Sequence, residues 1–244
     1  TSPDGGTNSI VALFYQPCLC WHWAAQLDEN VSEYALGIAA DSYGGAVVVG
    51  DFFSSSLNFG SGMVVNGVNS GHEGFVAKIS RSGVWTWAEG GLGIKELVKV
   101  AVDSNDDIYM LGYFGSSFIT INNSTMYSTG SSSSETEILV AAISSSGNWM
   151  WGNSVGTQYS DWHGDIAIDN RGDILISATT ASSPITFDSI QLSYSGSRGG
   201  YLASLDSLGN WLWAESFDFS ASGEVFGIYS QSNSVHVVGF FGKN

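Results

Sequence analysis

The chain has 244 residues, of which 43% are hydrophobic and 13% aromatic, so it is too apolar to be an intrinsically disordered protein. Seven lysines and arginines stand against 23 aspartates and glutamates, and the formal net charge of −16 argues against nucleic acid or an anionic membrane surface as a partner. No apolar stretch approaches the roughly 20 residues of a membrane-spanning helix, so we expect no membrane insertion.

The first predicted element, at residues 10–14, is a short apolar strand with the sequence Ile-Val-Ala-Leu-Phe. Similar strands return at residues 75–79, 139–143 and 201–205. A turn follows each of these later strands and contains Gly83, Gly147 or Gly209, which supplies the positive φ that tight turns need. We therefore predict a hairpin between each strand and the element after its turn.

The element after each turn carries the motif Trp-x-Trp. Its four starts are separated by 64, 64 and 62 residues, which makes this a repeat protein. The two rings lie at i and i+2 and so face one side of a strand. Because every copy has the pair, we interpret the tryptophans as structural core between repeats rather than a ligand site. The eight residues are Trp21, Trp23, Trp85, Trp87, Trp149, Trp151, Trp211 and Trp213.

Two further apolar strands, joined by a polar turn, follow each motif and begin near residues 38, 100, 166 and 228. Four strands per period are the content of a propeller blade. We therefore predict an all-β, four-bladed β-propeller with about 63 residues per repeat. A single domain would span residues 1–244, with repeats at 21–84, 85–148, 149–210, and 211–244 plus 1–20.

These elements resemble a known bacterial family. Phe75-Val-Ala-Lys-Ile79, Trp85-Thr-Trp-Ala88 and Val100-Ala-Val-Asp103 are similar to the bacterial β-propeller repeats often called SBBP. The resemblance implies a propeller fold and an extracellular or cell-surface location, and it carries over no catalytic residues. The fourth copy departs from the pattern, because Ser230 stands where the others have aspartate.

The fourth repeat is divided between the two ends of the chain. We expect the N-terminal strand, Ile10, Val11, Ala12, Leu13 and Phe14, to close the blade that the C-terminal strands begin, which would remove exposed sheet edges. This blade lacks a segment that the other copies have at residues 57–59, 118–121 and 185–187, where we predict a strand or outer loop. Closure within one chain is favoured, and strand exchange between chains stays open as the alternative.

One loop has the spacing of a calcium site. Asp103, Asn105 and Asp107 match Asp-x-Asn-x-Asp, but the glycine and distant glutamate of an EF-hand are missing. We favour turn chemistry for this loop and keep calcium as a weak candidate, with no other cofactor expected.

Asn30, Asn122 and Asn123 fit the sequon for N-glycosylation, which matters in a eukaryotic secretory route. Cys18 and Cys20 are spaced poorly for a mutual disulfide in an extended strand, so free thiols and bridges to another chain stay open.

The sequence contains no zinc-ligand spacing and no nucleophile elbow, so we expect no enzyme. The acidic, Ser- and Gly-rich composition favours an exported surface protein. Our leading hypothesis is a non-enzymatic extracellular structural module that self-associates, such as a subunit of a surface filament or appendage built by strand complementation between protomers. The alternative is a carbohydrate-binding, lectin-like propeller that binds glycans between its blades.

Overall fold

The computed structural model of the chain describes residues 9–15, 20–27, 32–68, 71–128, 136–155, 161–181, 183–194, 198–219 and 223–241. These residues form 22 β-strands and no helix, which confirms the predicted all-β class. In this part of the chain, no helix is therefore long and apolar enough to cross a membrane.

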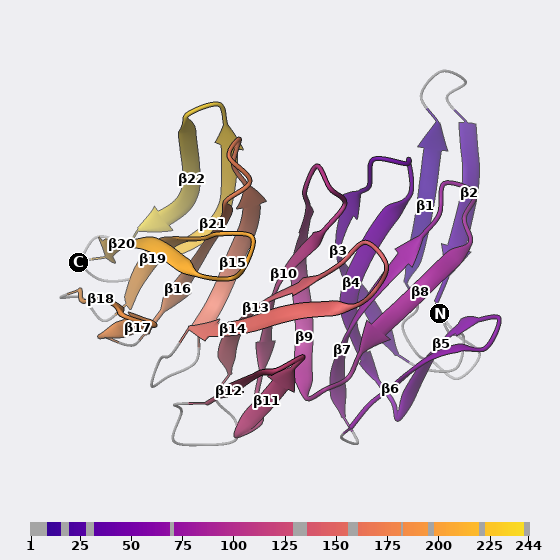
Figure 1. The fold of residues 1–244 in the computed structure, drawn as a ribbon, viewed down its shortest axis with the longest axis horizontal. Coiled ribbons are helices and arrows are strands. Elements are labelled where there is room, and N and C mark those ends of the chain that lie inside the picture. Colours follow the sequence, from indigo (N-terminus) through magenta and orange to yellow (C-terminus); the bar gives the residue numbers. More distant parts are fainter. Residues whose placement is uncertain are drawn as a thin grey trace.

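Three four-stranded antiparallel sheets form the body of the molecule (Figure 1). Blade 1 contains β3 (Glu33–Ala40), β4 (Ala46–Phe53), β7 (His72–Ile79) and β8 (Trp85–Gly90). Blade 2 contains β9 (Ile94–Val102), β10 (Ile108–Phe114), β13 (Glu137–Ile143) and β14 (Trp149–Val155). Blade 3 contains β15 (Asp161–Ile168), β16 (Ile174–Thr180), β19 (Arg198–Leu205) and β20 (Trp211–Phe219).

Each blade carries an outer hairpin between its second and third strands. These hairpins are β5 (Ser56–Gly60) with β6 (Met63–Asn66), β11 (Phe118–Ile121) with β12 (Ser124–Tyr127), and β17 (Ile185–Phe187) with β18 (Ile190–Leu192). They contain the segments expected to be strands or outer loops, and each of those segments is a strand.

The central strands are buried because both of their faces pack against a neighbouring sheet. Every residue of β10, β13 and β16 is buried. Burial is expected for their apolar runs, and it also takes in polar residues such as Glu137 and Ser177. One apolar core lies between blades 1 and 2 and a larger one between blades 2 and 3. Stacked sheets therefore bury side chains on both sides of a blade, and the exposed positions concentrate where the stack ends.

Each Trp strand is the last strand of its sheet, and it pairs with the apolar strand before it, as predicted. The sheets consequently run over residues 33–90, 94–155 and 161–219. The repeat boundaries drawn from the Trp motif cut each sheet between its third and fourth strands. The length of the repeat could be predicted from the sequence. The point in the repeat at which one sheet ends and the next begins depends on which strands share hydrogen bonds.

The predicted closure is not observed. The N-terminal hairpin, β1 (Ile10–Tyr15) with β2 (Cys20–Gln26), and the C-terminal hairpin, β21 (Gly223–Gln231) with β22 (Ser234–Phe241), are separate two-stranded sheets. They lie at opposite ends of an open array (Figure 1). Within the described residues β1 pairs with β2 and β22 pairs with β21, so β1 and β22 each keep an unpaired edge. β1 and β22 are not consecutive in the chain, so no short loop forces them to lie side by side. The order of the repeats alone therefore does not impose the pairing of β1 with β22.

Candidate functional site

In three of the four motifs the second tryptophan bonds to the turn of the following blade. The indole N–H of Trp87 donates to the carbonyl of Ser145 at 3.1 Å, and that of Trp151 donates to Ser207 at 2.9 Å. Trp23 makes the same bond to Arg81 at 2.7 Å. Each acceptor lies in the turn before the Trp strand of the following blade.

Glycine in that turn lets the indole ring lie on the backbone. Gly83, Gly147 and Gly209 have φ between 81° and 88°, as their turn positions predict. A Cβ atom at any of them would approach the indole of the preceding blade to 3.0 Å or less. The first tryptophans pack outward instead, since Trp85 meets Phe59 and Trp211 meets Phe187 edge to face at 5.1 and 5.0 Å. Trp213 has no partner equivalent to Ser145 or Ser207 among the described residues.

Replacing Gly209 by alanine should therefore destabilise the protein more than the same change at Gly172. Both residues have positive φ, at 88° and 86°, and alanine there costs roughly 1–2 kcal/mol. A Cβ at Gly209 would also lie 2.8 Å from the Trp151 ring, whereas Gly172 has open space. Overpacking adds about 1–3 kcal/mol. Urea unfolding of both variants measures the difference, and equal losses would show that the ring contact contributes nothing.

The calcium candidate loop is a hairpin turn held by one carboxylate. Asp103 Oδ1 accepts hydrogen bonds from the backbone amides of Asn105 at 2.8 Å and Asp107 at 2.9 Å. Asp41, Asp169 and Asp206 bond their own turns in the same way. This geometry fits the turn chemistry favoured from the sequence, and calcium binding by Asp103, Asn105 and Asp107 stays an untested prediction.

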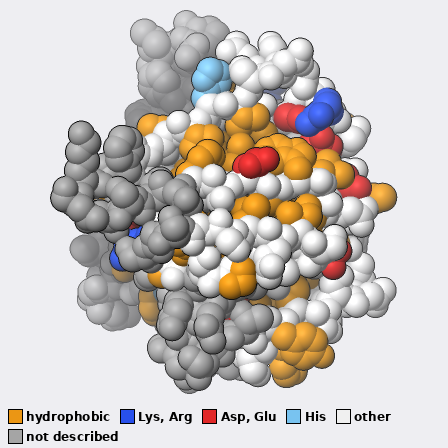
Figure 2. Space-filling model, turned by 90° about the vertical axis from the view of Figure 1, so that its left-hand side faces the viewer, with side chains coloured by type: hydrophobic (Ala, Val, Ile, Leu, Met, Phe, Trp, Pro, Cys, Tyr) orange, Lys and Arg blue, Asp and Glu red, His pale blue; other side chains and the backbone are white. Residues whose placement is uncertain are grey.

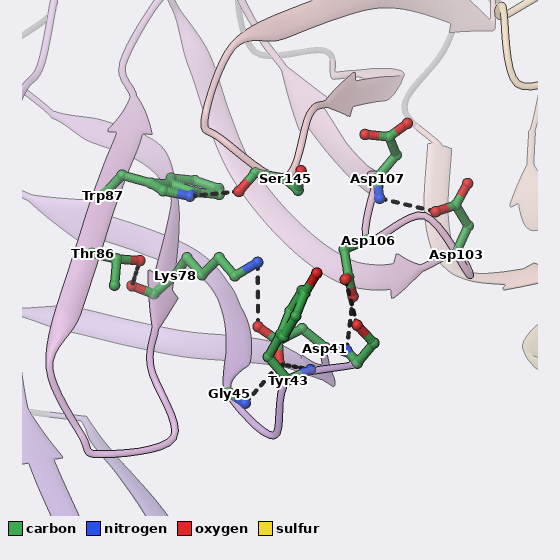
Figure 3. Close-up of polar contacts among 11 residues, drawn as sticks. Asp41, Tyr43, Gly45, Lys78, Thr86, Trp87, Asp103, Asp106, Asp107 and Ser145 are labelled. Atoms are coloured by element: carbon green, nitrogen blue, oxygen red, sulfur yellow. Dashed lines mark hydrogen bonds and ion pairs between the residues drawn. The ribbon is translucent and has the colours of Figure 1, made fainter.

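A neighbouring carboxylate links two blades (Figure 3). Asp106, in the β9–β10 turn, accepts hydrogen bonds from the backbone N–H and the hydroxyl of Ser42, in the β3–β4 turn, at 2.7 and 2.6 Å. These side-chain and backbone hydrogen bonds hold the pKa of Asp106 below its usual value. Asp41 in the same turn as Ser42 also binds Lys78 of β7 at 3.2 Å.

The bond between Ser42 and Asp106 predicts a pH dependence. A lowered pKa in the folded state means that the unfolded chain binds the proton more tightly, so the contribution of Asp106 is present above about pH 4 and is lost as pH falls through the folded pKa. Asp106→Asn should therefore lower stability at pH 7, with the gap to the parent closing in acid. Unfolding curves from pH 7 to pH 2.5 test this, and Ser42→Ala should give the same convergence. A gap independent of pH would contradict it.

The two described sequons sit at the tip of an outer hairpin. Asn122 donates its amide N–H to the carbonyl of Met150 at 2.9 Å, so its nitrogen is already bonded, whereas Asn123 is exposed. Asn30 and Cys18 lie outside the described residues, as does the side chain of Cys20. Glycosylation and the state of the cysteines stay predictions.

The C-terminal hairpin presents an apolar surface, the C-terminal face, defined by Phe226, Tyr229, Val238 and Phe240. The Phe226 and Phe240 rings are 5.6 Å apart, and Tyr229 lies beside His236 at 6.4 Å. Val238 is 63% exposed and Phe240 45% exposed. Figure 2 turns this end of the molecule toward the viewer and shows hydrophobic side chains gathered near its centre.

The equivalent positions in the internal blades are covered. The register of β21 with β22 places Val238 where blade 1 has Val49 and blade 2 has Leu111. Those side chains are 0% and 1% exposed, because the next blade packs on them. The C-terminal face is thus an inter-blade surface that no further blade covers among the described residues.

The opposite end has a smaller exposed surface, the N-terminal face, formed by Ile38 of β3. The Ile38 side chain is 60% exposed. Ile38 pairs with Val48, which packs with Val11 of the N-terminal hairpin, so Ile38 faces away from blade 2. Of the expected closure strand, Val11 packs in the core against blade 1, Ile10 is 70% exposed, and Ala12 and Leu13 are partly buried. The side chain of Phe14 lies outside the part of the chain that the structure describes.

A partly buried polar cluster lies where blade 1 meets blade 2. Asp51 of β4, His72 of β7 and Glu96 of β9 bring their side-chain ligand atoms within 4.8 Å of one another. Burial raises the pKa of Asp51 to about 6. Burial and the nearby Asp51 charge raise the pKa of Glu96, and burial lowers the pKa of His72. Sequence analysis missed this cluster, because three residues more than 20 positions apart form no motif.

Comparison with known proteins supports the propeller class and gives no specific family. No family model matches the chain. An uncharacterized WD repeat-containing protein of Acanthamoeba polyphaga mimivirus is 26% identical over 202 residues, covering 74% of this chain and 14% of the viral protein. The chain thus spans a small fraction of that relative. WD repeats form propeller blades, so this relative and the repeated four-stranded sheets identify a β-propeller-type repeat protein. The resemblance to SBBP repeats stays an expectation.

Two solved structures are similar at low scores. A protein of unknown function from Bacteroides caccae has 12% identity and a TM-score of 0.29, covering 87% of this chain and 92% of that chain. BamB from Moraxella catarrhalis has 12% identity and a TM-score of 0.23, covering 94% and 88%. These TM-scores are too low to support an argument about fold or function.

Proposed function

We propose that this protein is a non-enzymatic, extracellular assembly module whose copies join end to end. In this proposal the β22 edge of one copy pairs with the β1 edge of the next, so that two half-sheets make one four-stranded blade. The observation that carries it is the pair of complementary ends. The C-terminal hairpin supplies the first two strands of a blade and the N-terminal hairpin supplies the last two. In the part of the chain that the structure describes, both hairpins have an unpaired edge.

The internal blades define the register of this junction. Gly50 pairs with Phe75, Gly112 with Leu139, and Ala178 with Tyr201. Gly239 and Ile10 occupy the same positions in the terminal hairpins, so they are the expected partners across the junction. Val238 then lies opposite Val11, and Val237 opposite Ala12. The three residue pairs across the junction are antiparallel and bring apolar residues together, as the corresponding pairs do in blades 1 and 2.

The same junction covers both exposed faces. Inside the molecule, β9 packs across β3, β4 and β7 of the preceding blade. By that relation, β3 of the second copy packs across β21 and β22 of the first copy and across its own β1. The N-terminal face of one copy then meets the C-terminal face of the other. Strand pairing supplies hydrogen bonds and the faces supply apolar burial, which together favour a specific, extendable, head-to-tail contact.

The acidic, lysine-poor composition supports the extracellular part of the proposal. The lectin-like alternative has weaker support. A polar depression of about 500 Å³ lies between the turns of blades 2 and 3, lined among others by Asn105, Asn170 and Arg171. Its described lining contains no aromatic ring on which a sugar could stack. Assembly therefore remains the function we propose.

Cysteine cross-linking tests the junction and separates the two modes of closure. In a Cys18→Ser/Cys20→Ser background, one chain carries Val238→Cys and a second chain carries Val11→Cys. Adjacent antiparallel pairs alternate between close and wider Cα separations, of about 4.5 and 5.5 Å, so Val237→Cys with Ala12→Cys is made as a second set. Mixing the two chains under mild oxidation should give a disulfide-linked dimer for at least one set.

The double variant, with both cysteines on one chain, is the control for closure within the chain. End-to-end assembly predicts a ladder of linked oligomers from it, whose yield rises with protein concentration. A cross-linked monomer at every concentration would instead indicate a closed ring and overturn the proposal. The absence of any cross-link in both sets would overturn the pairing itself.

A further inference from the structure

The inter-blade cluster of Asp51, His72 and Glu96 has the composition of a metal site and is independent of the proposed assembly. Asp51 Oδ2 lies 2.6 Å from His72 Nε2. The Asp51 side chain is only 3% exposed, and Oδ2 has no hydrogen bond within the described structure beyond this contact. One imidazole therefore stands beside two carboxylates, one of which is almost completely buried. An uncompensated buried carboxylate is costly, and a bound cation is a common way to satisfy it.

The fold holds the three groups in place from three strands. Asp51 pairs with Gly74 across β4 and β7. A Cβ atom at Gly74 would lie 2.8 Å from Ile94 Cγ2 and 3.3 Å from the backbone carbon of Glu96. Glycine thus allows β9 to approach β7 and brings Glu96 to Asp51. The His72 imidazole packs on the Phe53 ring at a centroid distance of 4.1 Å, which orients it.

The corresponding place at another junction shows what the cluster lacks. Between blade 3 and the C-terminal hairpin, strand register puts Thr179, Arg198 and Glu224 at the positions of Asp51, His72 and Glu96. There Arg198 Nη1 binds Glu224 Oε1 at 3.3 Å, and Thr179 accepts a hydrogen bond from the Val225 amide at 2.9 Å. That junction has one carboxylate and its own permanent cation. The first junction has two carboxylates and a histidine, and the charge of the neighbouring Lys95 acts on His72 and Glu96.

We propose that Asp51, His72 and Glu96 bind a divalent first-row transition ion, with Zn²⁺ as the expected occupant. An imidazole nitrogen with carboxylate oxygens suits Zn²⁺, whereas Ca²⁺ and Mg²⁺ prefer oxygen ligands alone. At Zn–ligand distances of about 2.0–2.2 Å, tetrahedral ligands lie about 3.3–3.6 Å apart, so His72 and Asp51 separate while Glu96 moves in. The ion would link blade 1 to blade 2, with water as the fourth ligand.

Equilibrium dialysis with Zn²⁺, followed by metal quantification, tests the site. The untagged protein carries Cys18→Ser/Cys20→Ser and is first stripped with EDTA. We expect one Zn²⁺ per chain, and at least tenfold weaker binding in His72→Asn and in Glu96→Gln. Glu224→Gln, at the equivalent position, is the matched control and should bind as the parent does. Substoichiometric binding, or the same affinity in all variants, would overturn the proposal.

Thermal unfolding provides a second test of Zn²⁺ binding. It compares each variant with and without Zn²⁺, so a lower stability of one variant does not affect the conclusion. Zn²⁺ should raise the Tm of the parent and of Glu224→Gln by similar amounts, and it should raise the Tm of Glu96→Gln by clearly less. Asp51→Asn removes the buried charge, so its Tm without metal should equal or exceed that of the parent, and Zn²⁺ should not raise it. A Zn²⁺-dependent rise in Asp51→Asn as large as in the parent would exclude Asp51 as a ligand.

Discussion

Val238→Asp is expected to keep the chain monomeric at concentrations where the parent forms oligomers, without changing its fold. In a single copy Val238 is 63% exposed, so a carboxylate there is hydrated. In the proposed junction it occupies the position of Val49 and Leu111, which are essentially inaccessible to solvent. Burying an unpaired charge costs several kcal/mol, and each 1.4 kcal/mol is tenfold in affinity. Association should therefore weaken by about a hundredfold or more.

Sedimentation velocity across a concentration series measures this effect. Val84→Asp is the matched control, because Val84 is 60% exposed and lies in the β7–β8 turn, which belongs to neither terminal face as defined above. Parent and Val84→Asp should form oligomers whose size grows with concentration, and Val238→Asp should not. If Val238→Asp assembled like the parent, the C-terminal face would not be part of the contact. A parent that stays monomeric at every concentration would contradict end-to-end assembly.

Trp151→Ala is expected to cause the largest loss of stability of any single substitution considered. Trp151 is 8% exposed, packs near Tyr109 at a centroid distance of 6.1 Å, and lies on Gly209. Truncating a buried tryptophan to alanine costs about 3–5 kcal/mol, and the Ser207 carbonyl also loses its indole donor. Blades 2 and 3 would then lose one of the contacts that hold them together.

Trp213→Ala provides the comparison, because Trp213 holds the same place in its motif but has no equivalent turn to bond within the described residues. Chemical denaturation at a concentration below assembly should show a clearly smaller loss for Trp213→Ala than for Trp151→Ala. Equal losses would mean that the indole-to-turn contact adds no stability. Trp151→Phe separates the ring from its N–H and should fall between the parent and Trp151→Ala.

The secondary structure was largely predictable, because it depends on local signals that the repeat multiplies. Apolar runs such as residues 108–111 form fully buried strands, and Gly147 and Gly209 take the positive φ that their turns require. Asp103 bonds the amides of its own turn, as expected for an aspartate at that place. Because the same pattern of strands and turns recurs in four copies, each strand could be predicted from all four copies together.

The candidate sites were less predictable, because they depend on residues brought together from different blades. Asp51, His72 and Glu96 meet only after blade 2 has packed on blade 1. The exposure of Val238 and Ile38 is equally invisible in the sequence, where both look like the buried valines and isoleucines of other strands. Ser42 and Asp106 are 64 residues apart, and the sequence of neither turn predicts the hydrogen bond between them.

By itself, the sequence determined that this is an all-β repeat protein, where its hairpins turn, and which tryptophans recur, because period, turn residues and apolar runs act over a few neighbouring residues. Tertiary structure alone decided the phase of the blades, the face to which each tryptophan points, and the separation of the terminal hairpins. That separation has a physical reason. Pairing between β22 and β1 is not enforced by the connection of the chain, so it depends on which edges and faces meet in space.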